Sequence, residues 1–73
     1  MDRKRHGILI YDEKSGRYDI RFSLEHYYGG LHCGECFDVF IGSRWVPTRI
    51  EMSDRWYLVG VKTDHLAGLR VRM

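Results

Sequence analysis

The clearest pattern in this chain is a two-residue alternation of apolar and polar positions over residues 36–60. Successive side chains of a β-strand point to opposite faces, so this repeat predicts strands rather than helices. Two polar dipeptides, Gly42-Ser43 and Ser53-Asp54, interrupt the alternation. Both have the composition of tight turns, and the first has glycine at its first position. The stretch is therefore predicted to be a meander of three consecutive strands.

Pro47 lies in the middle strand of this predicted meander. Proline has no N–H group to donate to a β-ladder, so it is rare in the interior of a sheet. We therefore expect the strand to lie at a sheet edge, or to contain a bulge, at this position.

The alternation continues on both sides of the meander. A polar segment that ends in glycine, over residues 12–16, is typical of a turn and separates the first two predicted strands. Ala67-Gly68 forms the last predicted turn. The strands expected outside the meander cover residues 7–11, residues 17–22 and residues 69–73, and residues 61–64 are expected to continue the third strand of the meander.

Residues 23–30 show no clear period. Ser23 could cap a single helical turn over residues 24–28, or the segment could be a loop across an open barrel end. The glycine pair that follows ends the segment in either case. A strand is expected to restart over residues 31–33 and to bend at the next glycine.

These elements predict an all-β protein of five to six short strands. A chain of 73 residues forms one domain, and a sheet with one apolar face must curl or pack on a second layer. We predict a small antiparallel barrel of the SH3-like kind over residues 7–73, with an OB-like barrel as the alternative. Tight hairpins favour the SH3-like barrel. Residues 1–6 are expected to be a basic arm.

The net charge of +2 lies in this arm, which contains three basic residues, Arg3, Lys4 and Arg5, and one acidic residue, Asp2. The remainder of the chain is therefore neutral, since +2 minus +2 is zero. This falls short of the strongly basic profile of a domain that grips nucleic acid by charge alone. Most of the basic residues are arginines, which favour planar contacts with carboxylates and phosphates alike.

No apolar run approaches the roughly 18 residues of a membrane span, so no membrane association is expected. The short apolar run after the basic start lacks the features of a signal peptide. Two cysteines are too few for a disulfide scaffold. A cytoplasmic location with reduced thiols is therefore expected.

Short motifs also give the chain a resemblance to known proteins. They are Gly16-Arg17-Tyr18, Leu31-His32-Cys33-Gly34, Arg44-Trp45-Val46-Pro47-Thr48-Arg49-Ile50-Glu51, Arg55-Trp56-Tyr57-Leu58-Val59-Gly60 and Gly68-Leu69-Arg70-Val71-Arg72. Together they resemble a family of small bacterial domains of unknown function that mobile elements often encode. The resemblance covers about residues 7–72. It implies a compact β-domain in a prokaryotic, intracellular setting, and it assigns no activity or functional residue.

The first candidate site is a face rich in arginine with an exposed aromatic ring. Trp45 is the expected surface ring, whereas Trp56 alternates with Leu58 and is expected in the core. Such a face could stack nucleobases and contact phosphates, or bind a protein, because Trp and Arg are frequent hot-spot residues. A solvated face whose arginines pair with acidic side chains would give the same pattern. The candidate residues are Arg17, Arg21, Trp45, Arg49, Arg70 and Arg72.

The second candidate site is the pair Cys33 and Cys36, whose spacing supplies two of the four ligands of a structural zinc site. His26 and His32 lie close enough in the sequence to complete a set. The alternatives are a dithiol redox pair and ordinary packing of the two side chains. No cofactor other than this possible zinc ion is expected.

We find no nucleophile paired with a base, no Gly-x-Ser-x-Gly motif and no phosphate-binding loop. The sequence therefore predicts a non-enzymatic binding module, with nucleic acid as the favoured ligand. The alternatives are a protein–protein adaptor or inhibitor encoded by a mobile element, and a zinc-stabilised structural domain. Tyr27 and Tyr28 could form an aromatic patch, but they are expected to plug a barrel end.

Overall fold

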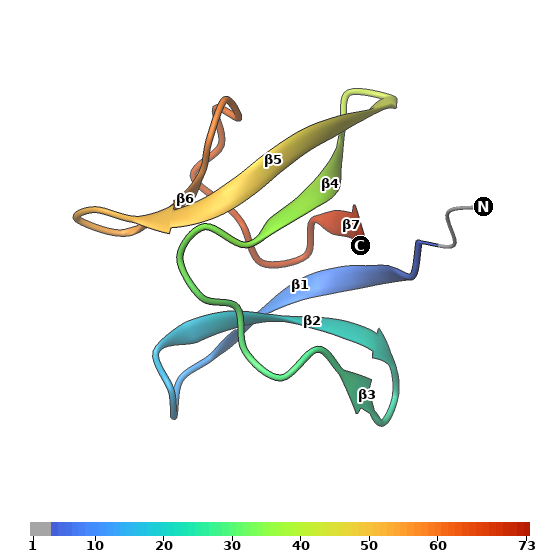
Figure 1. The fold of residues 1–73 in the computed structure, drawn as a ribbon, viewed down its shortest axis with the longest axis vertical. Helices are drawn as coiled ribbons and strands as arrows, with labels where there is room; N and C mark the ends of the chain where they lie inside the picture. Colours follow the sequence, from blue (N-terminus) through green and yellow to red (C-terminus); the bar gives the residue numbers. More distant parts are fainter. Residues whose placement is uncertain (1–3) are drawn as a thin grey trace.

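The computed structural model describes residues 4–73, which form seven β-strands and no helix (Figure 1). All strand pairs are antiparallel, in the order β3-β2-β1-β7-β4-β5-β6. The predicted all-β antiparallel fold is therefore confirmed, with seven strands rather than five or six. The strands are β1 (His6–Asp12), β2 (Arg17–Ser23), β3 (His26–Tyr27), β4 (Cys36–Ile41), β5 (Arg44–Met52), β6 (Trp56–Leu58) and β7 (Arg70–Arg72).

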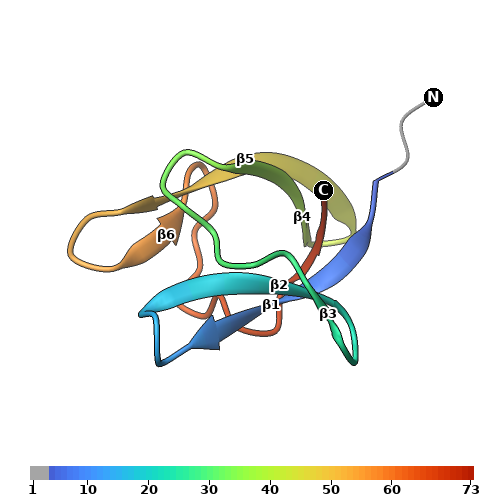
Figure 2. The ribbon, with the colours of Figure 1, turned by 60° about the horizontal axis from the view of Figure 1, so that its bottom comes forward.

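The last strand of the chain, β7, lies in the middle of the sheet between β1 and β4. On one side of it is the unit β1–β2–β3 and on the other the unit β4–β5–β6, and the sheet bends so that the two units face each other (Figures 1 and 2). Among the described residues no hydrogen bond joins the outermost strands, β3 and β6. The sheet is therefore open there, and closure into an SH3-like or OB-like barrel stays a prediction.

Residues 28–35 form an irregular linker that crosses from one unit to the other (Figure 2). Leu31 N–H donates to the carbonyl of Tyr18 in β2 at 2.8 Å, and Gly34 N–H donates to the carbonyl of Ile50 in β5 at 2.8 Å. The Asp19 carboxylate accepts the N–H groups of both glycines at 29 and 30, each at 2.9 Å. The linker thus hydrogen-bonds to both halves of the bent sheet.

This arrangement corrects the predictions for residues 23–33. The helical turn, one of the two alternatives for residues 24–28, is wrong, because His26–Tyr27 pair with β2 as a short strand. The strand expected over residues 31–33 is also wrong, because these residues belong to the linker. Tyr27 and Tyr28 are 48% and 37% exposed and plug nothing. Leu31, fully buried, fills the interior in their place.

Nine apolar side chains form the core between the two units. Val71 of the central strand and Ile50 of β5 are fully buried, as the alternation predicts. Trp56 is only half-buried, at the rim of the core, where its Nε1 donates to the carbonyl of Gly16 at 2.8 Å. The core residues are Leu9, Ile20, Leu31, Phe37, Val39, Ile50, Leu58, Leu66 and Val71.

The predicted turn between β4 and β5 is confirmed. Gly42 and Ser43 both have positive φ, 54° and 74°, which is the pattern of the type I′ turns that match the twist of a hairpin. Pro47 lies on the part of β5 that extends beyond β6, since β6 pairs only with positions 50–52. It therefore occupies a local sheet edge, as predicted.

The third strand of the meander is shorter than predicted. β6 ends at Leu58, and the chain turns at Gly60, where φ is 79°, so residues 61–64 do not continue the strand.

Residues 4–73 contain no helix of the length and apolar character that a membrane crossing requires.

Gly7 provides the first testable point, because β1 and β2 approach closely there. A Cβ atom at this position would lie 2.6 Å from Cγ2 of Ile20 and 2.8 Å from the carbonyl oxygen of Arg21. Gly7→Ala should therefore lower the free energy of unfolding by about 1–3 kcal/mol, although alanine is otherwise the stiffer residue. Urea unfolding at pH 7 measures this. Unchanged or higher stability would show that the two strands separate at no cost.

Candidate binding face

Strand pairing places six side chains in one line across the outer surface of the sheet. Tyr27 of β3 lies opposite Arg21 of β2, which lies opposite Ile8 of β1. Ile8 in turn lies opposite Arg70 of β7. The Arg70 guanidinium lies over the ring of Phe40 in β4, 5.2 Å from its centroid, and Phe40 lies opposite Trp45 of β5. We call this line the aromatic–arginine row: Tyr27, Arg21, Ile8, Arg70, Phe40 and Trp45.

The row faces away from the core because four of its six members alternate with buried residues. Leu9, Ile20, Val39 and Val71 are all fully buried, and each is next in sequence to a residue of the row. Since successive side chains of a strand point to opposite faces, the row must point outward. Its aromatic rings lie at its two ends, and its two arginines lie between them.

A second line of side chains supports Trp45. Arg72 lies opposite His6 on one side and Asp38 on the other. The His6 ring meets the Trp45 ring edge-on at 5.4 Å, and the Arg72 guanidinium lies 4.4 Å from the Trp45 centroid. Phe40 packs against it at 5.0 Å. Trp45 is therefore half-buried among these groups, less exposed than the predicted surface ring, and held in a fixed orientation.

Asp38 fixes two cations beside this ring. Its Oδ2 accepts hydrogen bonds from Arg72 Nε and Lys4 Nζ, both at 2.9 Å. These hydrogen bonds, first that of Lys4 and then that of Arg72, hold the pKa of the Asp38 carboxyl below its ordinary value of 3.8. Arg72 and Lys4 thus share one carboxylate, which offsets one of their two positive charges.

Arg21 and Arg70 keep their charges available. Within residues 4–73 neither side chain takes part in an ion pair. Arg21 donates from Nε to the carbonyl of Ser23 at 3.2 Å, which uses one of its donors. Beside Arg21 and Ile8 lies a hollow of about 320 Å³, on whose lining Leu24 is 80% exposed. The middle of the row therefore combines two free cations with apolar surface.

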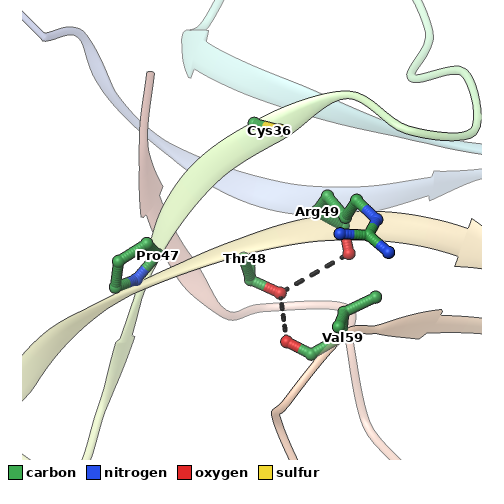
Figure 3. A pocket seen from close by; sticks show the side chains of 5 residues that line it. All are labelled: Cys36, Pro47, Thr48, Arg49 and Val59. Carbon is green, nitrogen blue, oxygen red and sulfur yellow. Dashed lines mark hydrogen bonds between the residues drawn. The ribbon is translucent and has the colours of Figure 1, made fainter.

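Arg49 lies away from the row. Arg49 is on the same outer surface as the row, where it lies opposite Cys36 of β4. It is two positions beyond Pro47 along β5. Its Nε donates to Glu51 at 2.9 Å, which neutralises its charge. A hollow of about 240 Å³ lies beside it. Figure 3 shows the side chains that line this hollow, where Thr48 Oγ1 donates to the carbonyl of Val59 at 2.8 Å.

Arg17 also lies away from the row, at the other end of β2. Its Nη1 donates to the carbonyl of Leu31 in the linker at 3.2 Å, and its guanidinium lies 5.9 Å from the Trp56 centroid. The structure thus brings together four of the six predicted residues, and Arg17 and Arg49 are not among them. The four are Arg21, Trp45, Arg70 and Arg72.

The sequence pattern alone named Tyr27 only as part of an aromatic patch or a barrel plug, and it did not single out Ile8, Phe40 and His6. Phe40 carried a signal, because it alternates with Val39 and Ile41 and so shares a face with Asp38. The places of the others follow only from the strand order, and β3 was not predicted.

Cys33 and Cys36 are both exposed, and neither forms a disulfide bond. The described part of the chain contains no group of three or more His, Cys, Asp and Glu side chains placed to hold a metal ion. In this arrangement His26 and His32 are not grouped with the two thiols, and a zinc site stays a prediction. The His26 ring is held instead by Ser23, whose Oγ lies 2.7 Å from Nδ1.

Asp38 gives a pH-dependent prediction. Because its pKa is lower in the folded chain, the ionised carboxylate stabilises the fold above about pH 4, and this contribution is lost as the pH falls through the lowered pKa. Asp38→Asn should cost about 1–2 kcal/mol at pH 7, since both cationic partners are partly exposed. Urea unfolding at pH 7 and pH 3 should show the difference between the two proteins shrinking at pH 3. A difference that is equal at both pH values would contradict this account.

Comparison with known proteins identifies the family of this chain. A model of the domain of unknown function DUF5348 matches residues 7–73. A solved protein from Ruminococcus gnavus is 67% identical over 94% of this chain and 100% of its own, with a TM-score of 0.90. No curated protein matches the sequence. The chain therefore belongs to the DUF5348 family, whose function is unknown.

Proposed function

We propose that this domain is a binding module rather than an enzyme, built on an SH3-like barrel, and that it binds single-stranded nucleic acid through the aromatic–arginine row. The observation that carries the proposal is the continuous line of rings and guanidinium groups across six strands. A bent sheet whose two halves are bridged by a linker supports the barrel.

The row has the chemistry that unpaired bases require. Rings on an open sheet surface can stack on splayed bases, because every base has a π-face, and arginines between the rings can contact phosphates. Neighbouring strands are about 4.8 Å apart, so six positions span about 24 Å along the surface. That length suits a short oligonucleotide bound across one small β-domain. Trp45, held by three neighbours, would lose little side-chain entropy on stacking.

A protein partner is the second candidate, and the apolar middle of the row favours it. Ile8 is 38% exposed and Leu24 is 80% exposed beside the hollow near Arg21. An adaptor or inhibitor could seat an apolar side chain there, with arginines at the rim. The salt dependence separates the two candidates, because phosphate contacts release counterions and apolar contacts do not.

Arg70→Ala tests the charge of the row. A phosphate contact to single-stranded nucleic acid contributes about 0.7 to the slope of log affinity against log salt. The variant should therefore bind a fluorescent 15-nucleotide oligonucleotide more weakly, with a salt slope that is smaller by about 0.7. Fluorescence anisotropy between 25 and 200 mM salt measures both quantities.

The matched control for Arg70→Ala is Arg55→Ala, which removes the same charge from an arginine that is 78% exposed and lies in the β5–β6 turn. If the wild-type protein fails to bind any oligonucleotide at the lowest salt, or if both variants weaken binding equally, the row is not a nucleic-acid site.

Trp45→Leu tests stacking separately from charge. Leucine keeps an apolar side chain against Phe40 but has no ring to stack on a base, so affinity should fall about five- to thirtyfold, the equivalent of 1–2 kcal/mol, with an unchanged salt slope. Tyr57→Leu is the control, since Tyr57 is a 42% exposed ring on β6, away from the row. Equal loss in both variants would argue against stacking on Trp45.

A further inference from the structure

An aromatic hollow lies where the β1–β2 turn approaches the β5–β6 turn, at the end of the strands away from the aromatic–arginine row. Both turns lie on the same side of the molecule in Figures 1 and 2. The hollow has a volume of about 330 Å³ and is lined by rings from three strands, Tyr11, Tyr18 and Trp56. We propose that it binds an organic cation, an alkylammonium group such as a free or N-methylated lysine side chain.

The rings present the negative faces that attract such a group. A cation within about 6 Å of a ring centroid is stabilised by the ring quadrupole, most strongly by tryptophan. Tyr11 and Tyr18 meet at 61° with their centroids 5.0 Å apart, so their faces are turned in different directions. Arg17, which does not line the hollow, already lies 5.9 Å from the Trp56 centroid. A cation of this same chain is thus already attracted to one of the three rings.

The charges at the rim favour a cation over an anion. Asp54 and Asp64 line the hollow together with one basic residue, Arg55, which gives a net charge of −1. Arg55 and Asp64 are 4.0 Å apart and are 78% and 80% exposed. A pair so exposed is worth little, so an incoming cation can replace Arg55 beside Asp64.

The hollow is formed before any ligand arrives. The hydrogen bond from Trp56 Nε1 to the carbonyl of Gly16 ties the β5–β6 unit to the β1–β2 turn at 2.8 Å. Met52, 46% exposed, and the buried Leu66 complete the apolar wall. A bound alkylammonium group would therefore meet rings that are already in place, with its methylene or methyl groups against the apolar wall.

The two tryptophans make the test specific, because a ¹⁵N-labelled sample gives one indole N–H signal for Trp56 in the hollow and one for Trp45 in the row. Tetramethylammonium chloride should shift the Trp56 signal in a saturable way and leave the Trp45 signal in place. Sodium chloride at equal ionic strength should not do so. The affinities for choline and for a short peptide containing trimethyllysine then show which kind of molecule carries the alkylammonium group. Equal affinity for the two probes indicates a small molecule, and tighter binding of the peptide indicates a polypeptide.

Variants fix the location of binding. Tyr11→Ala should weaken tetramethylammonium binding about three- to thirtyfold, and Asp64→Asn, at an 80% exposed position, about two- to fivefold. Tyr57→Ala is the control, because Tyr57 does not line the hollow. The proposal is overturned if sodium chloride reproduces the shift, or if Tyr57→Ala weakens binding as much as Tyr11→Ala. Neither result affects the nucleic-acid proposal, which depends on Trp45 and Arg70.

Discussion

The pairing of β7 with β1 and β4 is the interaction on which the rest of this structure depends. Val71 lies opposite Gly7 on one side and opposite Val39 on the other, so this three-residue strand supplies the strand pairing that joins the unit β1–β2–β3 to the unit β4–β5–β6. A domain of this size buries only about 60% of its unfolded surface and has little stability in reserve. Loss of the central strand would expose two sheet edges and the core together.

The same strand makes the fold and the binding face inseparable. Val71 is buried, while Arg70 and Arg72, on either side of it, point outward because of the two-residue period of a strand. Arg70 reaches the row, and Arg72 is held by Asp38 and packs on Trp45. Any shift of β7 by one residue would bury two guanidinium groups and expose Val71. The register is therefore strongly specified by burial of the core.

The alternation of residue types was sufficient to predict the long strands and most of the core, because burial of one face imposes a period of two. It could not predict β3 or the linker over residues 28–35, where hydrogen bonds to Asp19 and to the carbonyls of Tyr18 and Ile50 decide the conformation. These partners are distant in sequence and leave no periodic signal. Nor could it predict the strand order, so the alignment of Arg21 with Arg70 across β1 was not foreseeable.

The neutral charge of the chain beyond its arm argued against a nucleic-acid ligand, yet the charges are not evenly spread. Around the row lie the four cations Lys4, Arg21, Arg70 and Arg72, and Asp38 pairs with Lys4 and Arg72 among them, so these five groups sum to +4 − 1 = +3. At the other end of the strands the aromatic hollow carries −1. Salt screens exposed charges beyond about 8–10 Å, so a ligand responds to the charges near it rather than to their total over the molecule. A chain with a net charge of only +2 can therefore present a basic surface for an anion at one end and an acidic hollow for a cation at the other.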